Sequence, residues 1–301
     1  MREVQRVERG VPEYPRVLED LDNPPAQFYA IGDLGALAAA PGRLVAIVGT
    51  REASGYGLRV ARALGRAFAE AGVLVVSGMA RGIDSAAHLG ALEAGGKTIA
   101  VLGTGPDVPY PVGNRGLHGR IAETGLILSE SEPGRAAFQG CFPRRNRIIA
   151  ALAKATIVVE AGHKSGALNT ASQALQLGRV VGAVPGMIDV SEAAGSNVLL
   201  RDGALVIAGV SDALAAMSVS RKGTVSRPEM TEKEAVIWDV LSTVLADGMG
   251  PPATADGLAE LTGLAVRDVL SAVSNLELVG LVRRESDGRI TRADLATHNL
   301  I

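Results

Sequence analysis

The chain has 301 residues, of which 47% are hydrophobic, 21% are charged and only 3% are aromatic, and its formal net charge is −2. This length allows one large domain and one small domain. The near-neutral charge excludes a protein coated with positive charge, so contact with nucleic acid would depend on a local basic patch. The single cysteine, Cys141, excludes an internal disulfide, and a reducing cytosol is the natural setting for such a chain.

The sequence carries no recognisable targeting signal. Residues 1–10 are charged throughout, unlike a signal peptide, and no apolar run reaches the ~20 residues that a membrane-spanning helix needs. We therefore expect a cytoplasmic protein without a membrane span.

Residues 1–40 form a preface that is interrupted by Tyr14-Pro15 and by Asn23-Pro24-Pro25. Proline-containing turns of this kind predict helix and loop rather than strand. We expect the preface to pack on the core that follows it.

Between residues 41 and 217, continuous apolar runs alternate with stretches of helical periodicity. The apolar runs are typical of buried parallel strands and predict strands at 44–48, 73–76, 97–102, 126–128, 156–159, 180–184 and 205–207. The periodic stretches predict helices at 56–71, 85–94, 115–123, 141–152 and 165–177. This alternation predicts an α/β fold with a Rossmann-like, doubly wound parallel sheet.

A different pattern begins after this domain. Residues 218–230 are polar and contain glycine and proline, which indicates a linker. Helices are expected at 232–245, 254–261 and 265–276, followed by a hairpin over 280–290. This order predicts a small winged-helix-like domain at 231–301. Because Asp268 and Glu277 accompany Arg267 on its third helix, we favour a protein-interaction role for it over DNA contact.

The most distinctive stretch runs from Cys141 to Leu152 and contains Arg144, Arg145, Asn146 and Arg147 ahead of an apolar run. Proline at position 143 suits the first turn of a helix. On a helical wheel Arg147 lies opposite the apolar face, whereas Arg145 would fall on that face, so we expect Arg145 at the helix entrance with its side chain reaching past the end. Arginine at a helix start is better explained as a ligand for phosphate or a base than as a cap.

Local charge supports a basic patch. Between Arg135 and Ile188 there are seven basic residues and one acid, Glu160, which gives this segment a charge of +6. A solvated basic face is the alternative explanation.

Several predicted strands end in loops with small or ligand-suited residues. In an open parallel sheet, ligands bind outside the carboxyl ends of the strands, and glycines there let the backbone approach a phosphate. We expect Arg51, Arg81, Arg144 and Arg147 to surround one crevice. The loops concerned are Gly49-Thr50-Arg51, Ser77-Gly78, Gly103-Thr104-Gly105, 165–170 and Pro185-Gly186.

Common cofactor and catalytic patterns are missing. Residues 49–55 do not match the glycine pattern of dinucleotide-binding folds, and no Gly-Lys-Ser/Thr phosphate loop occurs. The histidines show no metal-ligand spacing, so we expect no metal and no cofactor. His88 is expected to bond Asp84 or a backbone group. Glu160 is the one plausible acid/base, although we favour its pairing with an arginine.

Five motifs recur here in the order and spacing of a known family, and together they span about residues 10–210. They are Val45–Arg51, Ser77–His88, Phe142–Arg147, Ser165–Thr170 and Pro185-Gly186. The sequence closely resembles the bacterial DNA-processing protein A family, also called DprA or Smf. The C-terminal winged-helix-like region fits the same family.

This resemblance implies a single-stranded DNA-binding protein of natural transformation that protects incoming DNA and loads the RecA recombinase onto it. It further implies a homodimer that is not an enzyme. A basic groove with an aromatic side chain is also what single-strand binding needs physically. Combining the motifs with the loops above, the expected DNA contacts are Thr50, Arg51, Ser77, Gly78, Arg81, Phe142, Arg144, Asn146, Arg147, Lys164, Ser165, Gly166 and Thr170.

An enzyme remains the rival interpretation. A nucleotide-binding hydrolase acting on a nucleoside monophosphate could use a similar Rossmann-like scaffold. Glu160 and the 165–170 loop could then serve the phosphate and the ribose. Against this, the loops offer no second acid/base, and three arginines within four positions exceed what one phosphate requires.

Overall fold

The computed structural model describes residues 3–38, 42–217, 230–244, 253–278, 281–284 and 288–292. The chain divides into two compact units, Met1–Lys222 and Gly223–Ile301. The division falls inside the predicted linker, of which residues 218–229 lie outside the described residues. Among the described residues, no helix is long and apolar enough to cross a membrane.

The first unit is built on a nine-stranded sheet in the order β1-β2-β6-β5-β4-β3-β7-β8-β9. The strands from β3 to β9 run parallel to one another, as the apolar runs predicted. Their bounds are β3 Leu44–Val48, β4 Leu74–Ser77, β5 Thr98–Leu102, β6 Leu126–Ser129, β7 Ala155–Val158, β8 Val180–Ala183 and β9 Leu205–Val206.

The N-terminal preface differs from the prediction, because much of it is strand. β1 (Gln5–Glu8) and β2 (Gln27–Gly32) form an antiparallel pair, and β2 continues the sheet antiparallel to β6. The turns that suggested helix and loop lie between these two strands, where η1 (Arg16–Asp20) is a short 3₁₀ helix. The sheet is therefore mixed, and mostly parallel.

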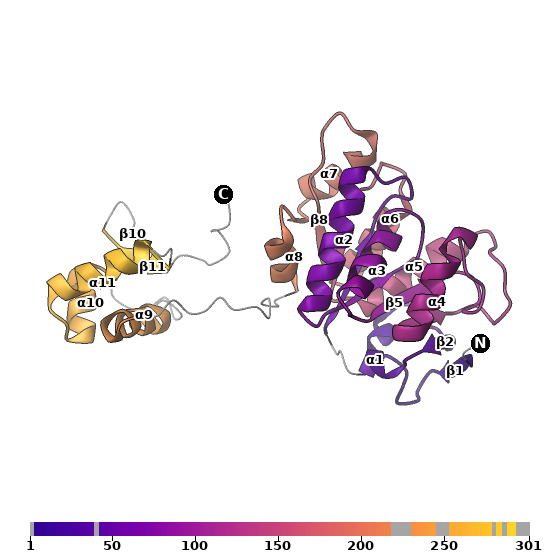
Figure 1. Ribbon diagram of the computed structural model, residues 1–301, viewed down its shortest axis with the longest axis horizontal. Helices are drawn as coiled ribbons and strands as arrows, with labels where there is room; N and C mark the ends of the chain where they lie inside the picture. The colour runs from indigo at the N-terminus through magenta and orange to yellow at the C-terminus, as the bar shows by residue number, and fades with distance from the viewer. Residues whose placement is uncertain are drawn as a thin grey trace. The chain divides into compact units, whose positions relative to one another are not determined.

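Helices cover both faces of the sheet, as Figure 1 shows. One face packs against α5 (Cys141–Leu152), α6 (Gly166–Gln176) and α7 (Ala194–Arg201). The other packs against α2 (Gly55–Glu70), α3 (Ile83–Glu93), α4 (Arg115–Thr124) and α8 (Val210–Ala216). The remaining short helices are α1 (Gly35–Ala38), η2 (Val112–Asn114) and η3 (Ser191–Ala193). Burial of β3 on both faces explains why its sequence is a continuous apolar run.

The second unit has the predicted succession of three helices and a hairpin. α9 (Glu232–Val244), α10 (Ala255–Thr262) and α11 (Val266–Leu278) are followed by the antiparallel strands β10 (Val282–Arg284) and β11 (Ile290–Arg292). Gly280, at the predicted start of the hairpin, lies outside the described residues. The unit has its own core, which includes Ile237, Leu258, Val273 and Ile290.

Candidate functional site

A pocket of about 890 Å³ opens at the carboxyl edge of the parallel strands. It lies where the strand order changes direction, between β3 and β7, which is where open α/β sheets bind ligands. Its walls come from residues 48–52 after β3, residues 80–84 after β4, the first turns of α5, residues 162–170 around the start of α6, and residues 191–192.

The loop after β3 is held by the end of β7. Gly49 leaves no room for a side chain, since a Cβ there would lie 2.8 Å from the Glu160 carbonyl oxygen, and Thr50 N–H donates to that same oxygen at 2.7 Å. The Glu160 carboxylate accepts from the backbone N–H and the hydroxyl of Ser54, at 2.9 and 2.5 Å. Ser54 is the N-cap of α2.

These bonds correct the expectation for Glu160. Its carboxylate does not pair with an arginine; it binds the start of α2, where the helix dipole favours an anion. Nor is Glu160 among the residues that line the pocket. Its role in the folded chain is therefore to fix the loop that carries Thr50 and Arg51.

Three exposed cations border the pocket: Arg51, Arg81 and Lys164. The Arg51 guanidinium lies over the ring of Phe142, with 5.2 Å from Cζ to the ring centroid. In the part of the chain that the structure describes, none of the three has a carboxylate within ion-pair distance. Their charges are consequently available to an anionic ligand.

Arg145 lies elsewhere than expected. It does not reach past the helix end: the residue is 6% exposed, and its guanidinium donates to the carbonyl oxygens of Gly78, at 2.7 Å, and Val101. It thereby ties α5 to the ends of β4 and β5 and forms part of the pocket wall. Burial lowers the pKa of Arg145 to about 10, against the attraction of Asp84.

Asp84 is the buried acid beside Arg145. Its carboxylate accepts from the backbone N–H groups of Gly78 and Ala80, at 3.1 and 3.4 Å. Burial raises the pKa of Asp84, and the charge of Arg145 and these hydrogen bonds oppose the rise. The pair shapes the loop after β4, and the Asp84 side chain also borders the pocket.

The sequence-predicted residues Ser77 and Gly78 lie behind the pocket wall. The Ser77 hydroxyl is buried and donates to Ile47 O at 2.6 Å. A Cβ on Gly78 would lie 2.4 Å from the Arg145 guanidinium nitrogens, so glycine is needed there to admit that arginine. Neither residue is among those that line the pocket.

Arg144 and Arg147 also lie outside the pocket, whereas Arg51 and Arg81 line it. Glu130 accepts from both, at 3.1 Å from Arg144 and 2.5 Å from Arg147. Arg147 further donates to Asn23 O at 2.8 Å, and its side chain is only 16% exposed, compared with 61% for Arg144. The four arginines therefore do not surround one crevice, and Arg147 does not face solvent as the helical wheel predicted.

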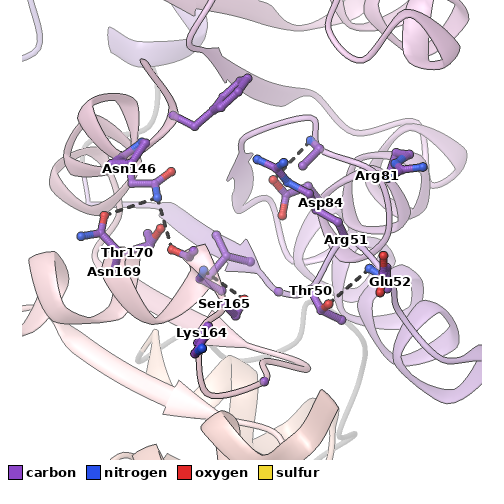
Figure 2. A pocket seen from close by; sticks show the side chains of 18 of the residues that line it. Thr50, Arg51, Glu52, Arg81, Asp84, Asn146, Lys164, Ser165, Asn169 and Thr170 are labelled. Carbon is purple, nitrogen blue, oxygen red and sulfur yellow. Dashed lines mark hydrogen bonds between the residues drawn. The ribbon is translucent and has the colours of Figure 1, made fainter. Parts of the chain in front are cut away.

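The opposite wall is formed by α5 and the start of α6. Asn146 donates to Gly166 O at 3.2 Å and to the Asn169 side-chain oxygen at 3.4 Å. Ser165 caps α6, accepting from Ala167 N–H at 3.3 Å. Figure 2 shows Arg51 facing Asn146 across the pocket, with Lys164 and Ser165 along the border near the start of α6. The N-terminus of α6 adds N–H groups and a positive dipole end, which attract anions.

Sequence reasoning missed several residues of this site. Asn169 lies inside the Ser165–Thr170 motif, but the sequence does not distinguish it from its neighbours. Ser191 and Glu192 follow the loop after β8, so the strand-end rule points to them. The prediction for His88 is wrong. Its Nδ1 lies 2.7 Å from the Thr98 hydroxyl rather than bonding Asp84 or the backbone, and burial lowers its pKa to about 3.

Chemically, the site combines cations, the Phe142 ring, amide groups and a helix N-terminus, with the side chains of Glu52, Asp84, His163 and Glu192 also in its lining. In the described parts of the chain, no group of three or more His, Cys, Asp or Glu side chains could hold a metal ion. Cys141 is buried. The arrangement suits a ligand that carries phosphate and a planar group.

Known proteins share both units. The family model of DNA recombination-mediator protein A matches residues 6–218, and that of the DprA winged helix domain matches residues 232–288. The chain is 42% identical to a putative DNA processing protein DprA from Mycobacterium tuberculosis, over 89% of this chain and 69% of that one. It is 37% identical to protein Smf from Synechocystis sp., over 93% of this chain and 78% of that one.

Solved structures agree. DNA processing protein A from Streptococcus pneumoniae superposes with a TM-score of 0.67 and 39% identity, over 71% of this chain and 74% of that chain. DNA processing protein A from Helicobacter pylori, described with a unique single-stranded DNA binding mode, superposes with a TM-score of 0.65 and 30% identity, over 72% of this chain and 98% of that one. Taken with the two family matches, these likenesses show that the chain belongs to the DNA-processing protein A (DprA/Smf) family.

Proposed function

We propose that this protein binds single-stranded DNA in the pocket between β3 and β7. The observation that carries the proposal is that Arg51, Arg81 and Lys164, which have no ion-pair partner among the described residues, line the same pocket as the half-buried ring of Phe142. Phosphates would lie against these cations and the N-terminus of α6, and a base would stack on Phe142 or on the Arg51 guanidinium. The relative from Helicobacter pylori, which binds single-stranded DNA, supports this choice of ligand.

The bound strand is, in our proposal, an incoming strand of natural transformation. The protein protects it in the cytoplasm and helps to load the RecA recombinase onto it, without catalysing a reaction itself. Support comes from the family description as a recombination mediator. We propose that it acts as a homodimer, because two pockets on one long strand would bind with greater avidity than either alone.

The rival hydrolase loses support from the geometry. The acid/base candidate expected from the sequence, Glu160, is hydrogen-bonded to Ser54 and is not a pocket-lining residue. Because Glu52, Asp84 and Glu192 do line the pocket, the mononucleotide comparison below decides between the hydrolase and the DNA-binding proposal, which we favour.

The direct test is fluorescence anisotropy with labelled oligothymidylates of increasing length, beside a mononucleotide and a duplex. We expect affinity to grow over several nucleotides, a preference for single strands, and a salt dependence of about −0.7 in log–log slope per neutralised phosphate. A flat salt response, or equal affinity for duplex, contradicts the proposal. Tight binding of the mononucleotide alone would favour the enzyme.

Arg51→Ala tests the pocket itself. This variant should bind single strands more weakly, and its affinity should depend less steeply on salt concentration, because the change removes one cation that can contact a phosphate. Arg66→Ala is the matched control: Arg66 is also an exposed arginine of this unit, but it lies near Glu93, with 3.4 Å between their side-chain atoms. Equal effects of the two variants would place the DNA elsewhere.

Loading requires a separate assay. RecA-dependent ATP hydrolysis on strands covered by single-strand-binding protein should start sooner when this protein is added. If no stimulation occurs at any ratio while DNA binding is intact, the recombinase role is removed and the binding role remains.

A further inference from the structure

The few aromatic side chains of this protein are unevenly placed. Among the described residues, three are more than a third exposed: Tyr56 at 46%, Tyr110 at 40% and Phe138 at 38%. They follow β3, β5 and β6 respectively, so all three lie at the carboxyl edge of the parallel strands, as does the pocket. A singly exposed ring needs no explanation, so the contacts of each ring decide whether it belongs to a binding surface.

Two of these rings belong to loops that are fastened together. The loop after β5 (103–111) and the loop after β6 (130–140) share the hydrogen bond from Gly105 N–H to Arg135 O, at 2.8 Å. Gly134 N–H donates to the Asp107 carboxylate at 2.7 Å, and the Ser131 hydroxyl donates to Gly103 O at 2.9 Å. The two loops therefore form one platform beside the start of α5.

One ring of this platform contacts an aromatic ring that lines the pocket. Tyr110 stacks on Phe142 with 5.2 Å between ring centroids and 29° between planes. The Arg51 guanidinium lies over the same Phe142 ring, as described above. The Arg135 guanidinium lies over Phe138, 5.3 Å from Cζ to the centroid. Tyr56, by contrast, has no ring or cation contact among the described residues.

Charge on the platform points to bases rather than phosphates. Arg135 is its cation, but Glu132 lies in the same loop and is exposed, and it would repel a backbone that ran close by. A π-face attracts any base by stacking, whatever the sequence.

We propose that Tyr110, together with the Phe138–Arg135 pair, is a second stacking site for the single strand. This inference rests on the proposed function: bases beyond those held at the pocket continue from Phe142 onto the platform, rather than across α2 past Tyr56. The site extends the footprint of the protein and is tolerant of sequence.

Oligonucleotide length separates the two sites. Tyr110→Ala and Phe138→Ala should bind a trinucleotide with nearly wild-type affinity, yet each should bind a long oligothymidylate about fivefold or more weakly, the loss expected for one stacked base. Tyr56→Ala is the matched control, because Tyr56 is somewhat more exposed than Tyr110 and Phe138 at the same edge, and it should bind every length as the wild type does. Tyr110→Phe should retain binding because it keeps the ring.

A fluorescent variant gives an independent readout. In Tyr110→Trp, binding of a long oligothymidylate should quench the new indole, and binding of a trinucleotide should not. The proposal is overturned if the wild type binds long strands tightly while Tyr110→Ala and Phe138→Ala match it at every length, or if Tyr56→Ala loses as much as they do. Failure of the wild type to bind single strands at any length would instead refute the proposed function.

Discussion

Replacing Arg145 with methionine should destabilise the first unit strongly, although the change keeps an unbranched, flexible side chain. The guanidinium is buried and donates to two carbonyl oxygens, Gly78 O and Val101 O, which belong to different strand ends. Leaving a buried acceptor unpaired costs about 1–3 kcal/mol, and this change affects two acceptors. Because the two losses share one side chain and are not independent, we expect a loss of roughly 2–4 kcal/mol in the free energy of unfolding.

The loss should depend on pH through Asp84. Burial already raises the pKa of this carboxyl, and the charge of Arg145 restrains the rise, so Arg145→Met should raise the pKa further. A group whose pKa is higher in the folded state contributes stability that is fully present below its unfolded pKa, about 4 for aspartate. That contribution is lost as pH rises through the folded pKa. The penalty of Arg145→Met should therefore be larger at neutral pH than near pH ~5.

Urea unfolding at both pH values measures this difference directly. Arg144→Met is the matched control on the same helix, since its side chain is 61% exposed and its surface ion pair is worth about 0–1 kcal/mol. Adding Asp84→Asn to Arg145→Met should remove the extra pH dependence. A penalty below about 1 kcal/mol, or one that is the same at both pH values, would refute the reasoning.

Three further outcomes are expected. The pKa of His88 falls to about 3 in the folded chain. The neutral imidazole therefore contributes to the free energy of unfolding above pH ~6.5, and roughly 4–5 kcal/mol of this contribution is lost as pH falls toward ~3. In His88→Gln, the free energy of unfolding measured with urea should fall less between these two pH values. Gly57→Ala should lower the free energy of unfolding by about 1–3 kcal/mol, since the new Cβ would lie 2.3 Å from a Glu160 carboxylate oxygen. In Gly55→Ala the new Cβ would lie 3.5 Å from the nearest atom, so thermal melts of this control should nearly match those of the wild type. Deleting residues 219–301 should leave a cooperatively folded unit that still binds single strands, because the two units have separate cores; aggregation or loss of binding in that shortened protein would place the boundary or the division of roles elsewhere.

Most of the sheet could be read from the sequence because its parallel strands are buried on both faces. A strand such as Leu44–Val48 is then apolar at every position, and the chain must turn after it. β1 gave no such signal, because only Val7 of its four residues is buried. β2 did carry aromatic and branched residues, and the prolines before it outweighed them in the prediction.

The pocket could be located from the strand-end rule, but the pairing of its charges could not. The charge of +6 belongs to residues 135–188 and leaves out Glu130, which binds Arg144 and Arg147 in the folded chain. Arg179 likewise pairs with Asp20, from the distant preface. Long-range ion pairs depend on topology, which makes a local charge count an upper limit on the positive charge that a segment presents.

The antiparallel pair at the N-terminus has a practical consequence for handling this protein. All four residues of β6, Leu126–Ser129, are buried, and β2 occupies their open side. If a shortened chain began at β3, the backbone N–H and C=O groups on one edge of β6 would lose their partners beside its apolar side chains, and edges of that kind pair with other chains and aggregate. Residues 3–32 thus act as a built-in solubility element, and trimming for crystallisation or spectroscopy belongs at the other end of the chain.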